Sequence, residues 1–402
     1  MMSTSKIVGA VEIGTAKITV LVGEVLEGQS LNIIGLGEAP SQGVQKGVVV
    51  DFKVASKLVH DALARAEKAA GASIDAVYIS QSGSHLNGFF HTSTVNVSSS
   101  TGTVYDSDVE RAVKEAKAKE LPDDRVYLHH IHNGYTLDGR PVVEPVGMQG
   151  EKLSLSYWSI HGDIQQVRDN IHVINAFGLT VEEAIVSSLA SGLMVTTDAE
   201  REHGVLVIDF GAGTTDYVLY QGGFVRASGS IPVGGDHITN DLSLGLRISQ
   251  KQAESLKIEF GKARLESADE EEKVWLIGDK MIGDRHLPKA ALVKIIEARA
   301  QELVGIIFQQ LKRVYEPKSI PAGIIMTGGA SLLPSLGNLV ESTFHQEVKM
   351  GITPSWVRED LASPAYSTAL GLLHFALTGQ AMQVPRSSGR SRLWGRVAKI
   401  FN

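Results

Sequence analysis

Two segments of this chain, about 200 residues apart, follow one sequence pattern. The first reads VEIGTAK at 11–17 and the second reads IDFGAGTTD at 208–216. Each lies between two apolar runs rich in β-branched residues, so each predicts a β-hairpin with an acid on the incoming strand and a tip of glycine and threonine. Glycine lets backbone N–H groups come close to a phosphate, and a carboxylate beside them suits Mg²⁺. Two such hairpins facing each other would hold a nucleotide tail from both sides.

The composition limits the classes of protein to which this chain can belong. The chain has 402 residues, 43% of them hydrophobic, which is enough for a large core and several folding units. It has no cysteine, which excludes disulfides and Cys-ligated zinc. The net charge is −7, although residues 386–402 hold five basic residues and no acidic one. An acidic body argues against nucleic-acid binding, and the basic end suggests a segment with a partner of its own.

The remaining patterns predict alternating strands and helices around the two hairpins. Helices are expected at 53–70, 164–176, 185–195, 237–246, 249–260, 288–315 and 363–377, and strands at 76–80, 179–184 and 324–327. Residues 84–162 differ in character, with strands expected at 92–97, 125–131 and 152–160 and a helix at 106–119. We interpret this stretch as a small inserted α+β unit.

The order of these elements resembles the actin-like ATPases, which include actin, Hsp70-type chaperones and sugar kinases. More narrowly, the whole chain resembles the FtsA family of bacterial cell-division proteins. The resemblance implies an α/β, two-lobed actin-like fold with an inserted α+β subdomain. The expected parts are a first lobe (1–83 and 163–197), the inserted assembly subdomain (84–162), a second lobe (198–235 and 320–378) with its own subdomain (236–319), a linker (379–389) and a terminal amphipathic helix (390–402).

The resemblance also implies roles for single residues, with ATP and Mg²⁺ as the bound cofactors. Mg²⁺ would be held by Glu12 and Asp209, in part through water, although the superfamily often has Asp where this chain has Glu12. Asp209 and Glu183 would help position the attacking water, but Glu183 fits an acid at a helix start equally well. The residues expected to contact ATP are Gly14, Thr15, Ala16, Lys17, Gly211, Gly213, Thr214, Thr215, Gly234, Gly235, Glu254, Lys257, Gly328 and Gly329.

The last residues form a second distinct pattern. On a helix, the apolar residues of 390–402 share one face and the basic ones another, which is typical of a helix lying in a membrane interface. The alternative is a terminal helix docked on its own domain. The residues of the two faces are Leu393, Trp394, Val397, Ile400 and Phe401, and Arg392, Arg396 and Lys399.

The resemblance implies an ATP-binding protein that polymerises on the cytoplasmic face of the bacterial inner membrane at the division septum, tethers FtsZ filaments there and recruits later division proteins. By resemblance, its partners would be the C-terminal tail of FtsZ, further copies of itself, downstream membrane proteins of the divisome and an anionic membrane surface, with no nucleic acid. Arg299 could pair with an acid of the FtsZ tail or could be a solvated helix charge. Hydrolysis would at most be slow. The alternatives are a sugar kinase of the same fold and, third, an Hsp70-like chaperone.

Histidines inside the insert raise a further possibility. His129, His130 and His132 lie close together in the sequence, and on a strand His130 and His132 share one face. Two histidines fall short of the ligands that zinc usually takes, so a polar strand face is the preferred interpretation.

Overall fold

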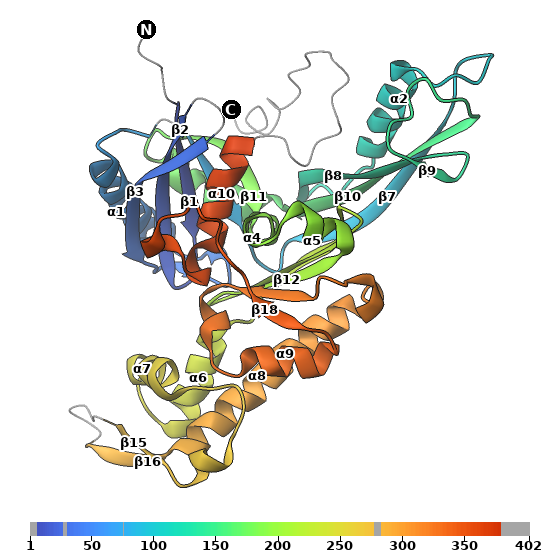
Figure 1. The fold of residues 1–402 in the computed structure, drawn as a ribbon. Helices are drawn as coiled ribbons and strands as arrows, with labels where there is room; N and C mark the ends of the chain where they lie inside the picture. The colour runs from blue at the N-terminus through green and yellow to red at the C-terminus, as the bar shows by residue number, and fades with distance from the viewer. Residues whose placement is uncertain (1–5, 27–29, 75, 277–282, 379–402) are drawn as a thin grey trace.

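The computed structural model describes residues 6–26, 30–74, 76–276 and 283–378, which form two similar β-sheets and two peripheral subdomains (Figure 1). The first sheet has the order β11-β6-β1-β2-β3. Its antiparallel part is β1 (Lys6–Ile13), β2 (Lys17–Leu26) and β3 (Ser30–Pro40), and its parallel part adds β6 (Ala76–Gln81) and β11 (Thr180–Val186). A short hairpin of β4 (Val44–Gln45) and β5 (Val48–Val49) follows β3.

The second sheet repeats the design of the first. Its order is β14-β13-β12-β17-β18, with an antiparallel part made of β12 (Val205–Phe210), β13 (Thr215–Gln221) and β14 (Phe224–Ile231). β17 (Ile324–Thr327) and β18 (Val348–Met350) then add in parallel. Both hairpins expected from the sequence are confirmed, and each joins the first two strands of its sheet.

Two helices lie between the sheets and give the lobes a common core. α4 (Ser187–Val195) is buried along its whole length, as its apolar composition requires. α10 (Ser367–Thr378) crosses α4 so closely that a Cβ on Gly371 would stand 2.0 Å from the carbonyl oxygen of Ala190. Residues up to 378 were expected in the second lobe, but α10 also packs on β1, β2 and β6 of the first sheet (Figure 1).

The outer face of the first sheet is covered by α1 (Phe52–Ala70) and α3 (Ile164–Asn175). The alternation of β2 explains this arrangement, because Val20 and Val22 face α1 and α3 while Leu21 faces the core between the sheets. A short helix, α5 (Asp198–His203), leads into the second sheet.

The insert is a separate four-stranded sheet with one helix, and it extends away from the body (Figure 1). Its strands are β7 (Asn87–Asn96), β10 (Lys152–Asp163), β8 (Arg125–Leu137) and β9 (Arg140–Val142), and α2 (Asp106–Lys117) packs on them. β7 begins five residues before the expected strand, in a stretch whose aromatic and histidine residues hide the alternation.

The other peripheral subdomain follows β14 and has its own small core. It contains α6 (Gly235–Leu246), α7 (Gln250–Phe260), β15 (Lys273–Leu276), β16 (Arg285–Pro288) and α8 (Lys289–Leu311). α9 (Leu336–Phe344) packs between α8 and β18. Two expected helices lose four residues at one end: α8 ends at Leu311, before Pro317, and α10 starts only at Ser367 because Pro364 opens a separate 3₁₀ turn.

Candidate nucleotide-binding cleft

A cavity of about 500 Å³ lies between the two lobes, and both hairpin tips line it. The tips close in the same way: the Gly14 N–H donates to the Lys17 carbonyl (3.1 Å), and the Gly211 N–H donates to the Thr214 carbonyl (2.9 Å). They also touch, because a Cβ on Gly213 would lie 2.3 Å from Oγ1 of Thr15. Only glycine at 213 permits this approach, so the contact between the tips sets the floor of the cleft.

Most residues that were expected to contact ATP line this cavity. They are Gly14, Thr15, Ala16, Lys17, Gly211, Gly213, Thr214, Gly235, Glu254, Lys257, Gly328 and Gly329. Thr215 is buried behind the tip and donates to the Val233 carbonyl (2.9 Å). Gly234 also stands behind the wall, where a Cβ would meet the Gly211 carbonyl oxygen at 2.5 Å. Both residues shape the loop that closes the cleft without lining it.

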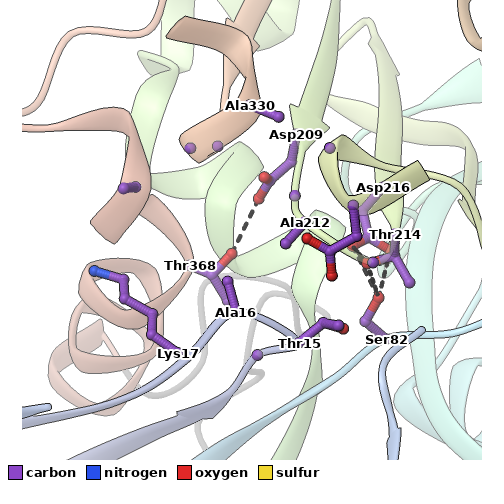
Figure 2. A pocket seen from close by; sticks show the side chains of 18 of the residues that line it. Thr15, Ala16, Lys17, Ser82, Asp209, Ala212, Thr214, Asp216, Ala330 and Thr368 are labelled. Carbon is purple, nitrogen blue, oxygen red and sulfur yellow. Dashed lines mark hydrogen bonds between the residues drawn. The ribbon is translucent and has the colours of Figure 1, made fainter. Parts of the chain in front are cut away.

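Three carboxylates gather in the cleft, of which those of Asp209 and Asp216 are buried and that of Glu12 is half-buried. Burial, with Asp209 next in importance, raises the pKa of Glu12 to about 8 and that of Asp216 to about 7. Burial also raises the pKa of Asp209. Hydroxyl groups hold two of the three: Thr368 donates to Asp209 (3.0 Å), and Ser82 donates to Asp216 (2.9 Å), as Figure 2 shows.

This cluster fits a magnesium–phosphate ligand by its chemistry. One oxygen of Glu12, Oε2, is buried and has no hydrogen-bond partner among the described residues. Mg²⁺ takes oxygen ligands from one or two carboxylates together with phosphates and water. A cation would also remove the mutual repulsion of the carboxylates. The described residues contain no group of three His, Cys, Asp or Glu that could hold a metal by itself, so an ion here would need phosphate or water to complete its shell.

Lys17 lines the cleft but its amine is already engaged. Nζ lies 2.7 Å from Oε1 of Glu38 and 3.6 Å from the centre of the Tyr366 ring. Tyr366 in turn donates to Oε2 of Glu38 (3.2 Å). The expected position at the phosphates therefore requires the side chain to leave Glu38, which its length and partial exposure allow.

The opposite wall is partly apolar. Lys257 pairs with Glu254 (2.7 Å) and donates to Thr239 (2.9 Å) and to the Gly235 carbonyl (3.1 Å). Beside this polar group, Ile258 is 74% exposed and Leu332 is 58% exposed, and both line the cavity. Exposed apolar side chains in a cleft provide a surface on which a flat base can pack.

Glu183 does not reach the cleft, and the structure corrects its assignment. It lies within β11 and faces the insert, where Oε1 is 4.0 Å from Nδ1 of the buried His129. Burial raises the pKa of Glu183 to about 7 and lowers that of His129 to about 4. It also does not stand at a helix start, because α4 begins only at Ser187. The register of β11 against β6, with an irregularity just before Glu183, directs this side chain toward His129 of the insert.

Arg299 lies in the middle of α8, outside the lining of the cleft, and is paired within the chain. Its guanidinium lies 2.6 Å from Asp241 and 2.5 Å from Glu302. These residues line a shallow surface cavity of about 380 Å³ together with Lys294, Ile295 and Ala298. The membrane-facing residues expected at 392–401 lie outside the described part of the chain.

The histidines of β8 do not form a metal site in the described part of the chain. His130 and His132 share a face, and each packs against tyrosine: His130 against Tyr127 (4.3 Å between ring centres), His132 against Tyr135 (4.6 Å). Burial lowers the pKa of both histidines to about 4. This strand face was expected to be polar, but much of it is formed by histidine and tyrosine rings that pack against each other.

Sequence reasoning missed four side chains of the cleft region. Asp216 was part of the second pattern but was assigned no role. Ser82 and Thr368, which hold the carboxylates, come from distant segments and carry no local signal. Glu38, the partner of Lys17, lies 21 residues further along the chain. Only the paired position of Asp216, directly after the Gly/Thr tip, could have pointed to a function.

Comparisons with known proteins agree with this geometry. The family model "Cell division protein FtsA" matches residues 206–371, and the model "SHS2 domain inserted in FTSA" matches residues 83–161. FtsA of Pseudomonas aeruginosa is 33% identical over 396 residues, which cover 96% of this chain and 94% of that protein. The chain belongs to the FtsA family of cell-division proteins. FtsA of Escherichia coli K12 is 32% identical and covers 97% of this chain and 96% of its own length.

Solved structures give the fold independently of the FtsA sequences. The PilM-PilN type IV pilus biogenesis complex matches with a TM-score of 0.62 at 16% identity, over 92% of this chain and 98% of that chain. MreB5 of Spiroplasma citri bound to ADP matches with a TM-score of 0.55 at 15% identity, over 93% and 97%. The expected actin-like fold with an inserted subdomain is confirmed. Membership of the FtsA family favours cell division over the sugar-kinase and chaperone alternatives.

The described residues contain no helix that is both long and apolar enough to cross a membrane.

The raised pKa of Asp216 leads to a pH prediction. The folded chain keeps this proton up to about pH 7, whereas the unfolded chain loses it near 3.8. Stability therefore falls as pH rises through this window, because the folded state binds the proton more tightly. We expect Asp216→Asn, measured by urea unfolding without nucleotide, to match the parent near pH 4 and to exceed it by about 2–4 kcal/mol at pH 8. Asp123→Asn, at an exposed position, is the control. A difference that is constant with pH would contradict the assignment.

Proposed function

We propose that this chain is an ATP-binding, membrane-tethered member of the divisome that links FtsZ filaments to the inner membrane. The observation that carries the nucleotide part is the contact between the two hairpin tips beside Glu12, Asp209 and Asp216. Backbone N–H groups at the tips would cradle the phosphates, and the carboxylates would hold Mg²⁺. Glu254, Lys257, Gly328 and Gly329 would receive the adenosine, next to the apolar wall formed by Ile258 and Leu332.

Related proteins support the choice of ligand. MreB5 of Spiroplasma citri, which shares the fold, was solved with ADP and with AMPPNP. We take Mg-ATP to be a ligand that controls conformation and polymerisation, with hydrolysis slow at most. Asp209 remains the proposed residue for orienting water at the phosphates, and Glu183 is withdrawn from that role because it lies outside the cleft.

The first test of this proposal is Lys17→Ala. If Lys17 leaves Glu38 to contact the phosphates, its loss removes a charge-assisted contact and should weaken ATP binding by about 10-fold or more. ATP affinity is measured by calorimetry in the presence of Mg²⁺. Lys57→Ala, an exposed lysine of α1 outside the cleft, should bind like the parent. A folded Lys17→Ala protein with parental affinity would show that the amine stays with Glu38.

Binding of FtsZ is proposed at the surface of α6 and α8 that contains Arg299. An acidic residue of the FtsZ tail would compete with Asp241 and Glu302 for the guanidinium, and Ile295 would offer an apolar contact. We expect Arg299→Glu to weaken binding of a synthetic FtsZ tail peptide by at least about 10-fold, since it removes a charge-assisted pair and adds repulsion. Arg313→Glu, exposed beyond the end of α8, is the matched control. Equal peptide affinity in both variants would place the contact elsewhere.

Membrane attachment is proposed to depend on residues 390–402. One apolar side chain contributes at most about 1.5–3 kcal/mol, and each basic residue near an anionic leaflet contributes about 1 kcal/mol. These gains must also offset the ordering of a short helix. A single tail should therefore bind moderately, and a filament with many tails should bind far more tightly.

This reasoning predicts that Trp394→Glu will release the protein from anionic liposomes while ATP binding persists. High salt should weaken the parent only in part, because salt does not screen the apolar contribution. The measurement is co-sedimentation, with truncation before Arg390 as the reference for full release. If both altered proteins sediment with liposomes like the parent, the terminal helix is docked on its own domain and does not anchor the chain.

A further inference from the structure

The insert is joined to one lobe by its chain and to the other lobe by its side chains. It leaves the first sheet after β6 and returns at the start of α3. Its strands nevertheless pack against β14, the edge strand of the second sheet. The insert is therefore in contact with both lobes.

Two hydrogen bonds hold the insert against β14, at two positions along the strand. Nε1 of Trp158 donates to Oγ of Ser228 (2.8 Å), and this pair is buried. Nδ2 of Asn133 donates to the Val225 carbonyl (2.7 Å). Gly88 makes room for the indole, because a Cβ there would lie 2.3 Å from the Trp158 ring.

Aromatic contacts extend the same interface. Phe224 at the start of β14 meets the His132 ring edge-on at 6.3 Å between centres. Arg226 lies over the Phe90 ring at 5.7 Å. The contacts alternate along β14, from Phe224 to Ser228, so the strand is held over most of its length.

The last residues of β14 connect this interface to the cleft. Ser230 stands opposite Asp216 in the β13–β14 register. Its Oγ accepts from the Gly83 N–H (3.0 Å) and lies 3.2 Å from Oγ of Ser82. Ser82, the first residue after β6, contacts both Asp216 oxygens (3.0 and 2.9 Å). One hydroxyl cluster therefore joins the root of the insert, β14 and a carboxylate of the cleft.

We propose that the insert is a brace between the two lobes, and that Ser82 couples its docking on β14 to nucleotide binding in the cleft. The coupling rests on the proposed binding of ATP. Any rotation that moves β14 relative to the first sheet must either carry the insert along or break its contacts. With the insert docked, Ser82 and Ser230 hold Asp216 in place beside the phosphate tips. Linkage makes the effect reciprocal, so bound nucleotide also tightens the docking.

The test separates bridging from coupling. The chain has no cysteine, so spin labels can be attached through Val143→Cys at the exposed tip of the insert and Ser342→Cys on α9 of the second lobe. The label-to-label distance distribution is measured without nucleotide. Trp158→Phe with Asn133→Ala should broaden it, whereas Trp275→Phe, a half-exposed tryptophan of β15, should not. An unchanged distribution in the double variant would overturn the brace.

Coupling is read from ATP affinity in a double-mutant cycle. Trp158→Phe and Ser228→Ala, which lie outside the cleft lining, should each weaken ATP binding about 5-fold or more. In a Ser82→Ala background the same changes should have little further effect. Ser154→Ala, whose hydroxyl pairs with Thr94 on the insert surface, should bind ATP like the parent.

Unchanged affinity despite a broadened distance distribution would overturn the coupling. An effect of equal size with and without Ser82 would overturn the role of that residue. If the parent itself binds no ATP, the proposed function fails and the coupling with it, while the label distances still decide whether the insert bridges the lobes.

Discussion

The contact between Thr15 and Gly213 is the constraint on which the cleft depends. Each sheet contributes one hairpin of the same design, and the contact forms where the tips of the two hairpins meet. Once the tips touch, Glu12 of the first hairpin lines the same cavity as Asp209 and Asp216, which face each other across the second hairpin. Burial raises the pKa of all three carboxyl groups, and repulsion from Asp209 raises those of Glu12 and Asp216 further. A cation with phosphate groups would relieve the repulsion, which gives a nucleotide differential affinity for this arrangement of the lobes.

The electrostatics of the cleft are uneven, and this shapes the proposed function. Negative charge collects at the centre, while the nearest cations, Lys17 and Lys257, are already paired with Glu38 and Glu254. Binding of a phosphate tail therefore exchanges existing ion pairs for new ones and gains little net charge pairing. Affinity would then depend on Mg²⁺ and on the backbone cradle. This is consistent with a ligand that selects a conformation more than with one committed to fast chemistry.

The position of the insert gives the two lobes a second connection. α4 and α10 join the two sheets through a common core. The second connection is made by β14, whose Ser228 accepts a hydrogen bond from Trp158 of the insert. The proposed coupling would use this connection to transmit the state of the cleft to the insert. Glu183 and His129 lie at a different contact, between β11 of the first sheet and β8 of the insert, so changes there would act on the root of the insert and not on the chemistry of the cleft.

Local sequence determined much of this protein. The two hairpins, the insert and most helices could be predicted because glycine tips, β-branched strands and helical periodicity act over a few residues. Residues that line the cleft within these patterns, such as Gly14 and Gly211, could be named for the same reason. Only the tertiary structure decided the partners from distant segments: Ser82 on Asp216, Glu38 on Lys17, and α10 on the first sheet. It also moved Glu183 away from the site, because the register of β11 against β6 decides where that side chain points. Such pairings depend on how the sheets and helices pack together, and no short stretch of sequence encodes that packing.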